Sequence, residues 1–219
     1  HATEFSLDSY STFTIGVGEN FEPADEGWGP RQVPSMSGHP DLAWHIVESA
    51  MAEEFDLAVH ASMDLDHGFT VPLSIAYGQP KEWPAAVVPV CVNVIQHPLP
   101  TALRCYKLGQ AIGRAVASFP EQINVGIWGT GGLSHQLGGE RVGVVNPEFD
   151  QKFLDNLSRD PLANTRISHT EFMREAGCEG VEMIMWNVMR GVLEDDVDEV
   201  FRLYHIPVSA TAYGAIILE

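Results

Sequence analysis

Hydrophobic residues follow two different spacings along this chain, and these spacings predict strands and helices in turn. Short apolar runs bounded by glycine, proline and polar residues predict strands over 11–17, 56–61, 85–95, 123–129 and 210–218. Apolar positions at helical spacing predict helices over 41–55, 100–119, 146–157, 169–177, 180–192 and 196–205. Because strands alternate with helices, the sequence predicts the α/β class: a single domain with a mixed, mostly parallel central sheet flanked by helices.

The length and the two ends of the chain bear on its domain organisation. Its 219 residues fit one large α/β domain better than two small ones, and they suffice to bury a core. The sequence begins at His1 rather than at a methionine, and it stops at Glu219 directly after an apolar run. We therefore expect a domain truncated at its N-terminus and also at its C-terminus.

The charge of the chain excludes several classes of partner. Thirty acidic residues against 12 basic ones give a formal net charge of -18. A surface this acidic repels phosphate backbones and anionic lipids, so we expect neither nucleic acid nor a membrane as a partner. The three cysteines are odd in number and lack CxxC spacing, which disfavours a disulfide framework and a thiolate zinc site. This usage favours a reducing, cytoplasmic compartment.

A glycine-rich segment carries the first candidate for chemistry. Five glycines lie within residues 129–139, directly after a predicted strand, and His135 lies among them. Ligands of open α/β sheets bind where strands end. The segment lacks GxGxxG spacing and the Lys-Ser/Thr of a P-loop, which disfavours a phosphate cradle. His135 is therefore a candidate catalytic or ligating residue, and the alternative is a histidine hydrogen-bonded within its own loop.

Two further residues stand out by their surroundings. His67 lies in a predicted loop between Asp64 and Asp66, where a carboxylate can orient the ring, and the alternative is an exposed turn. Glu182 falls within the apolar helix predicted over 180–192, where a buried carboxylate must be paired, protonated or bound to a metal. The alternative for Glu182 is neutralisation by Arg174 or Arg190. Histidines and a carboxylate without thiolates fit a 2-His-1-carboxylate iron site.

The other polar features have simpler interpretations. We expect structural or exposed roles for the remaining internal histidines, which are His39, His45, His60, His97, His169 and His205. The acidic run at 194–200 is typical of the solvated first turns of a helix, where carboxylates complement the helix dipole.

Five longer motifs together point to one family. They are EPADEGWGPRQVP, MDLDHGFTVPLS, WGTGGLSHQL, GCEGVEMIMW and YHIPVSATA. In this order they resemble the class III extradiol ring-cleavage dioxygenases, the family of the catalytic (beta) subunit of protocatechuate 4,5-dioxygenase, with gallate dioxygenase a close relative. The likeness runs along essentially the whole chain. It implies that residues 1–219 form a single extradiol dioxygenase catalytic domain.

The resemblance also implies a site, position by position. The family holds a non-haem Fe(II) with two histidines and one glutamate. His1 and Glu182 match two of these ligands, and the third, a histidine, is expected upstream of residue 1. His135 matches the acid–base catalyst, and His67 matches a second catalytic and substrate-binding histidine of the pocket. Ser209 matches a serine near the substrate carboxylate, and the family often has asparagine at the next position, where this chain has alanine.

The implied activity is cleavage of a catecholic acid such as protocatechuate, with O2, to a muconic semialdehyde. Gallate and 3-O-methylgallate are alternative substrates. Alternatives of other classes are a metal-free binding or scaffold protein of the same fold and a zinc hydrolase that uses the same histidine and glutamate. The implied partners are a catecholic acid, O2, a small alpha subunit and a homo- or hetero-oligomer. The long loop 18–40, with Phe21 and Trp28 exposed among prolines, is a candidate contact surface, and the alternative is a self-packed Ω-loop.

Overall fold

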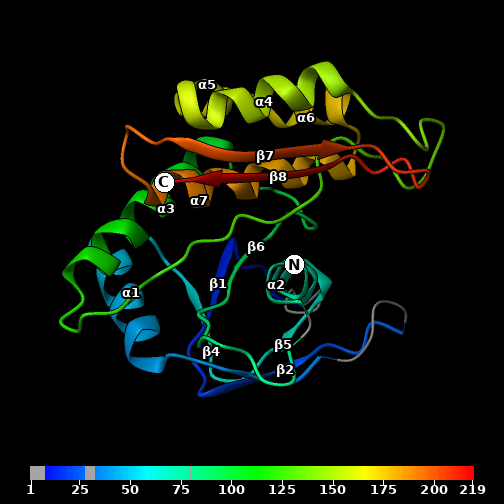
Figure 1. Cartoon of the computed structure of the whole chain (residues 1–219). Helices are drawn as coiled ribbons and strands as arrows, with labels where there is room; N and C mark the ends of the chain where they lie inside the picture. The colour runs from blue at the N-terminus through cyan, green and yellow to red at the C-terminus, as the bar shows by residue number, and fades with distance from the viewer. Residues whose placement is uncertain (1–7, 28–32, 79) are drawn as a thin grey trace. The chain divides into compact units, whose positions relative to one another are not determined.

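The chain folds as two compact units (Figure 1). The computed structural model describes residues 8–27, 33–78 and 80–219. Unit 1 comprises residues 1–100 and 114–125, and unit 2 comprises residues 101–113 and 126–219. Helix α3 (Ala102–Ser118) belongs to both units, because its first part lies in unit 2 and its last turns lie in unit 1. The expectation of one catalytic domain over 1–219 stays a prediction.

Unit 1 contains two small mixed sheets. In the first, β1 (Phe13–Gly16) pairs in parallel with β4 (Ala58–His60) and antiparallel with β6 (Val90–Val92). In the second, β2 (Asn20–Pro23) pairs antiparallel with β3 (Met36–Ser37) and in parallel with β5 (Asp64–Leu65). The helices of this unit, besides the end of α3, are α1 (Pro40–Ala52) and α2 (His67–Tyr77).

The core of unit 1 corrects the interpretation of the long loop at 18–40. This segment contains β2 and β3, and the pairing of these strands turns Phe21 inward, so that it is 1% exposed. Phe21 packs with Met36, Leu65 and Leu73 in one buried cluster. It is therefore a core residue and not an exposed contact, which favours self-packing for the described part of the segment. Trp28 lies outside the described residues.

Two histidines of unit 1 have the structural roles expected for them. His39 precedes α1, where its Nδ1 accepts a hydrogen bond from the backbone N–H of Leu42 at 3.2 Å and so caps the helix. The Nε2 of His45 lies 3.0 Å from the Oγ of Ser118. Both imidazoles also contact the ring of Phe119 edge-on. These histidines therefore fix α1 against the end of α3.

Unit 2 consists of helices and one β-hairpin. Strands β7 (Glu199–His205) and β8 (Tyr213–Leu218) pair antiparallel. The helical elements, besides the start of α3, are α4 (Pro147–Arg159), α5 (Pro161–Thr165), α6 (His169–Ala176), the 3-10 helix η1 (Glu179–Met185) and α7 (Trp186–Val192). One face of the hairpin meets both α4 and α7: Tyr204 of β7 bonds Asp150 of α4, and its register partner Gly214 of β8 packs against Trp186 at the start of α7.

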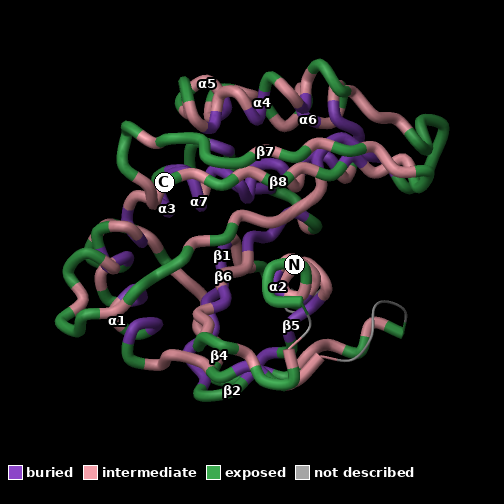
Figure 2. Tube along the Cα trace, viewed as in Figure 1, coloured by how far each residue is buried: buried purple, intermediate pink, exposed green. Residues whose placement is uncertain are grey.

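The helix predicted over 196–205 is wrong, because most of this segment forms strand β7. Exposed and intermediate residues alternate along β7 and β8 (Figure 2). Arg202 and Tyr204 face α4, whereas the apolar Phe201 and Leu203 lie on the exposed side. The strand-like alternation of side chains is therefore present in β7, but its apolar residues face solvent. A sequence pattern that assumes apolar residues are buried does not identify such a strand.

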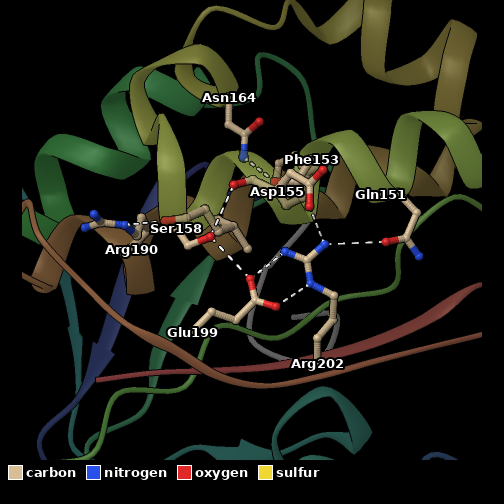
Figure 3. A network of polar contacts seen from close by, with 9 residues as sticks. Gln151, Phe153, Asp155, Ser158, Asn164, Arg190, Glu199 and Arg202 are labelled. Carbon is tan, nitrogen blue, oxygen red and sulfur yellow. Dashed lines mark hydrogen bonds and ion pairs between the residues drawn. The ribbon is translucent and has the colours of Figure 1, made fainter.

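Arg202 holds β7 against α4 (Figure 3). Its Nε and Nη2 donate to the two carboxylate oxygens of Glu199 at 2.8 and 2.6 Å, and its Nη1 donates to Oδ1 of Asp155 at 2.5 Å. The fully buried Arg190 has a different role in the same region, because its Nε donates to the carbonyl oxygen of Leu157 at 2.6 Å. Arg202 thus joins β7 to α4, and Arg190 joins α7 to α4.

The predicted α/β class is confirmed, but the strands form three small sheets rather than one large central sheet. Of the run at 85–95, only β6 forms a strand; Val87 makes an isolated bridge with Gly38, and Pro89, directly before β6, has no N–H to donate. Residues 123–129 form no strand, and Val125 and Trp128 are exposed. An extended segment needs a partner for its backbone groups, and no described strand pairs with this one. No helix in the described part of the chain is long and apolar enough to cross a membrane.

A close helix contact in unit 2 gives a stability prediction. A Cβ atom at Gly109 of α3 would overlap the carbonyl oxygen of Val188 in α7, and a backbone atom cannot rotate away. We expect Gly109→Ala to lower the free energy of unfolding by about 1–3 kcal/mol through overpacking. Urea unfolding measures this change. The control is Gly138→Ala, where a Cβ meets nothing within 4 Å, and equal stability of the two variants would contradict the proposed contact.

Candidate active site

The segment around His135 is buried and tightly held, although glycines flank it on both sides. Residues 133–136 are all buried, and His135 is 5% exposed. His135 donates its backbone N–H to the carbonyl oxygen of Ala176 at 2.7 Å. On the other side, Leu133 and Ser134 exchange backbone hydrogen bonds with Ala212 at 3.2 and 3.1 Å. The histidine is therefore held between the end of α6 and the segment that leads into β8.

The imidazole of His135 has a defined orientation. Its Nδ1 lies 2.7 Å from the carbonyl oxygen of Leu133. A carbonyl oxygen can only accept, so this contact requires the proton on Nδ1 and assigns the Nδ1–H tautomer. Nε2 is then the basic nitrogen of the ring. A buried histidine with one nitrogen fixed in this way can take up and return a proton at the other.

The glycines before His135 make room for groups of the protein itself. A Cβ at Gly132 would lie 2.6 Å from Cε1 of His135. Gly131 has a φ of +115°, and a Cβ there would lie 3.1 Å from the Cβ of Glu182. The loop can therefore pack directly against the His135 ring on one side and against η1 on the other.

Glu182 lies on η1, and the same loop contacts its carboxylate. The backbone N–H of Gly132 donates to Oε2 of Glu182 at 3.1 Å. The predicted helix 180–192 is split, because the first residues form the 3-10 helix η1 and α7 begins only at Trp186. Glu182 is partly buried rather than fully buried. His135 and Glu182, which lie 47 positions apart, are thus both in contact with the glycine-rich loop.

Arg174 and Arg190, the two candidate neutralising partners of Glu182, form their hydrogen bonds with other groups. Arg174 donates from Nε to Oε1 of Glu175 at 2.7 Å. Arg190 donates to backbone carbonyl oxygens, including those of Glu194 and Asp195 at 2.8 Å each. The interpretation of Glu182 as half of a buried salt bridge with either arginine is therefore wrong.

His67 lies in unit 1 and begins a helix, so the loop predicted for it is wrong. β5 ends at Leu65, and α2 begins at His67. Its partner is a residue that the sequence reasoning did not single out: Glu26 accepts the His67 backbone N–H at Oε2 (2.8 Å), and its Oε1 lies 2.7 Å from Nδ1 of the ring. Both carboxylate oxygens of Glu26 therefore orient one histidine. The available signal was the place of Glu26 within the first of the five motifs.

Ser209 lies in the exposed turn between β7 and β8. Thr211, two residues later, forms an isolated antiparallel bridge with His135, so the turn leads directly to the histidine segment. Ala210 has a φ of +52°, in the left-handed region that asparagine and glycine adopt more readily than alanine. The asparagine that the resemblance implies at this position would adopt this conformation more readily than Ala210 does.

The described residues contain part of the predicted site. His135, Glu182 and Ser209 belong to unit 2, His67 belongs to unit 1, and His1 lies outside the described residues. Within the described residues, no three or more His, Cys, Asp or Glu side chains gather as a metal-binding group. The roles assigned to the individual residues stay predictions.

The described site thus combines an α/β fold, a buried and oriented histidine, and a loop that also contacts a carboxylate, an arrangement that suits proton transfer to or from a bound substrate. The particular family comes from comparison with known proteins. Residues 1–214 match the family described as the catalytic LigB subunit of aromatic ring-opening dioxygenase. The chain belongs to this family, which confirms the predicted resemblance.

Individual relatives agree with the family. The chain is 46% identical over 196 residues to a gallate dioxygenase from Pseudomonas putida, covering 90% of the chain and 57% of the relative. It is 32% identical over 167 residues to a 2,3-dihydroxyphenylpropionate/2,3-dihydroxicinnamic acid 1,2-dioxygenase from Photorhabdus laumondii, covering 76% of the chain and 49% of the relative. The chain thus spans about half the length of these curated relatives.

A solved structure supports the fold. The crystal structure of an uncharacterized protein from Escherichia coli K12 matches with a TM-score of 0.62 and 12% identity, over 93% of this chain and 79% of that chain. At this identity the likeness concerns the fold alone.

Proposed function

We propose that this protein is a non-haem Fe(II)-dependent extradiol dioxygenase that opens the ring of a catecholic acid with O2. The observation that carries the proposal is the buried His135, whose Nδ1 is fixed on the Leu133 carbonyl oxygen while the same loop contacts Glu182 through Gly132. Membership of the ring-opening dioxygenase family supports the same reaction. Of the catecholic acids considered, we favour gallate, because the match to the gallate dioxygenase is stronger than that to the dihydroxyphenylpropionate enzyme.

The donor chemistry of Glu182 fits the metal. Carboxylate and imidazole are the ligands of a 2-His-1-carboxylate iron site, and the carboxylate of Glu182 is partly buried and oriented by the N–H of Gly132. In the proposal, Glu182 and His1 would hold the metal. When bound, Fe(II) supplies adjacent open positions for a catechol and O2.

The residues of the chain would handle protons and substrate. Nε2 of His135 would accept the proton of a substrate hydroxyl group, since its Nδ1 is already committed as a donor to Leu133. Burial of the ring keeps bulk water from competing for that proton. We assign His67 as a second proton-handling and substrate-binding residue, and the hydroxyl of Ser209 as a hydrogen-bond donor to the substrate carboxylate. A small alpha subunit and an oligomer remain predicted partners.

Oxygen uptake by the protein at its natural length tests the proposal. The protein is loaded anaerobically with Fe(II) and offered gallate, protocatechuate, 3-O-methylgallate and 2,3-dihydroxyphenylpropionate. We expect uptake with the highest kcat/KM for gallate. Metal-free and Zn(II)-loaded protein are the controls that separate a binding protein and a zinc hydrolase from a dioxygenase. Absence of uptake with every catecholic acid would contradict the proposal.

The contact between Glu26 and His67 gives a further prediction. Glutamine at position 26 offers only one acceptor oxygen, so it cannot accept from both the backbone N–H and the ring of His67. Loss of one charged hydrogen bond is worth about 1.5 kcal/mol, and we expect Glu26→Gln to lower kcat/KM about tenfold. Steady-state oxygen uptake measures this effect.

The matched control is the neighbouring carboxylate of Asp25. Its Oδ1 accepts the backbone N–H of Gly27 at 3.0 Å, so Asp25→Asn disturbs the same segment without removing an acceptor from His67. We expect this variant to keep the wild-type kcat/KM. Equal loss of activity in both variants would show that the segment, rather than the contact with His67, matters.

A further inference from the structure

A buried carboxylate that none of the proposed roles uses lies beneath the His135 segment. Asp150, in the first turn of α4, is fully buried. It accepts three hydrogen bonds: Oδ1 from the backbone N–H of Ser134 at 2.9 Å, and Oδ2 from the Ser134 hydroxyl at 2.5 Å and from the Tyr204 hydroxyl at 2.8 Å. All three donors are neutral. Burying a carboxylate with only neutral partners costs free energy of desolvation, which suggests that Asp150 has a specific role.

The hydrogen-bond pattern fits an ionised Asp150. The Ser134 hydroxyl oxygen accepts the backbone N–H of Asn146 at 2.7 Å, which leaves its own proton available for Asp150. As a carboxylate, Asp150 accepts in all three of its contacts. Burial raises the pKa of Asp150 above its ordinary value, and the hydrogen bonds from Ser134 and Tyr204 oppose this rise.

One peptide group links Asp150 to the catalytic candidate. The amide between Leu133 and Ser134 donates its N–H to Oδ1 of Asp150 at 2.9 Å. The carbonyl oxygen of the same amide lies 2.7 Å from Nδ1 of His135. A negative charge at the N–H end polarises the amide and makes its carbonyl oxygen a stronger acceptor. The two hydrogen bonds therefore form one chain from the carboxylate through the peptide plane to the imidazole.

We propose that Asp150 is a positioning residue, which orients His135 and strengthens its Nδ1–H hydrogen bond through the Leu133–Ser134 peptide. In serine hydrolases a carboxylate performs this task by direct contact with the histidine; here a peptide group stands between them. The acid–base part of this inference rests on the proposed function, whereas the effect of Asp150 on the His135 ring does not.

The competing explanation is a purely structural role, because Asp150 also joins α4 to β7 through Tyr204. Asp150→Asn separates the two explanations, since it removes the charge and keeps the size of the side chain. We expect kcat to fall about tenfold to a hundredfold, as for other residues that orient a functional histidine, with KM nearly unchanged. In a His135→Ala background, Asp150→Asn is expected to have no further effect on kcat. If Asp150→Asn lowered kcat by the same factor in the His135→Ala background as in the wild type, the proposal would be overturned.

A second readout does not depend on activity. In the metal-free protein, the Nδ1–H proton of His135 is followed by NMR with nitrogen-15 labelled histidine. We expect its resonance to move upfield in Asp150→Asn as the hydrogen bond to Leu133 weakens. Should that variant not fold, Asp150→Glu, which displaces the charge by one methylene, is expected to move the resonance in the same direction. An unchanged resonance in a folded variant would overturn the proposal.

Two controls complete the test. Asp155 lies on the same helix and bonds Arg202 instead of the His135 segment, so Asp155→Asn is expected to leave both kcat and the resonance unchanged. Tyr204→Phe removes one hydrogen bond to Asp150 but leaves the peptide contact, and we expect a loss of stability with a small change in kcat. If wild-type protein lacks ring cleavage but the resonance responds to Asp150→Asn, the proposed function fails and this inference stands.

Discussion

Replacement of His135 by alanine is expected to lower kcat about 100- to 10,000-fold, the usual contribution of a general acid–base residue. The reason is that Nε2 is the basic nitrogen of a ring whose other nitrogen is committed to the Leu133 carbonyl oxygen. Iron content is expected to stay at the wild-type level, because His135 is not assigned as a ligand. Oxygen uptake and metal analysis on the same preparation measure the two quantities.

The control for this prediction is His205→Ala. His205 lies at the exposed end of β7, and its replacement is expected to leave kcat unchanged. Near-full turnover by His135→Ala would show that the acid–base assignment is wrong, whatever the iron content.

Replacement of Glu182 by alanine is the second change with a large expected effect. We expect iron affinity to fall by at least about 100-fold, since loss of an outer-shell partner alone is worth 10- to 100-fold. Ring cleavage is expected to disappear with the metal. The apo protein also loses the acceptor of the Gly132 N–H, which lowers the free energy of unfolding by about 1–2 kcal/mol.

The matched control is Glu179→Ala. Glu179 lies three residues earlier on the same 3-10 helix and accepts the backbone N–H of Leu137 at 3.3 Å. We expect this variant to bind iron like the wild type after anaerobic loading and desalting. Stoichiometric iron in Glu182→Ala would remove Glu182 from the ligand set.

The sequence predicted those elements of the fold whose apolar residues face a core. Helix α3 follows the predicted span closely, and the fully buried β1 lies within a predicted strand. β7 was predicted as a helix, because its apolar residues lie on the exposed side of the hairpin. The segment at 123–129 shows the opposite error. Its apolar run has a strand-like pattern but forms no strand, because a strand needs a pairing partner for its backbone groups as well as a pattern.

The candidate site divides in the same way. His135 and Glu182 could be found because each breaks a local pattern, one among glycines and the other within an apolar segment. Glu26 and Asp150 could not, because each looks locally like an ordinary polar residue. Their contacts, to His67 and to Ser134, join residues 41 and 16 positions apart, and such pairings exist only once the chain has folded. Residues that orient a functional side chain are therefore the part that local patterns do not show.

We propose that His135 transfers the proton in a ring-opening dioxygenase site of this protein. Mass analysis of the product formed from gallate by the iron-loaded protein under O2 tests it most directly. We predict a ring-opened product with the mass of gallate plus one O2, formed with equal consumption of O2, and strongly reduced formation by His135→Ala. O2 consumption without that product, or equal product from His135→Ala, would contradict the claim.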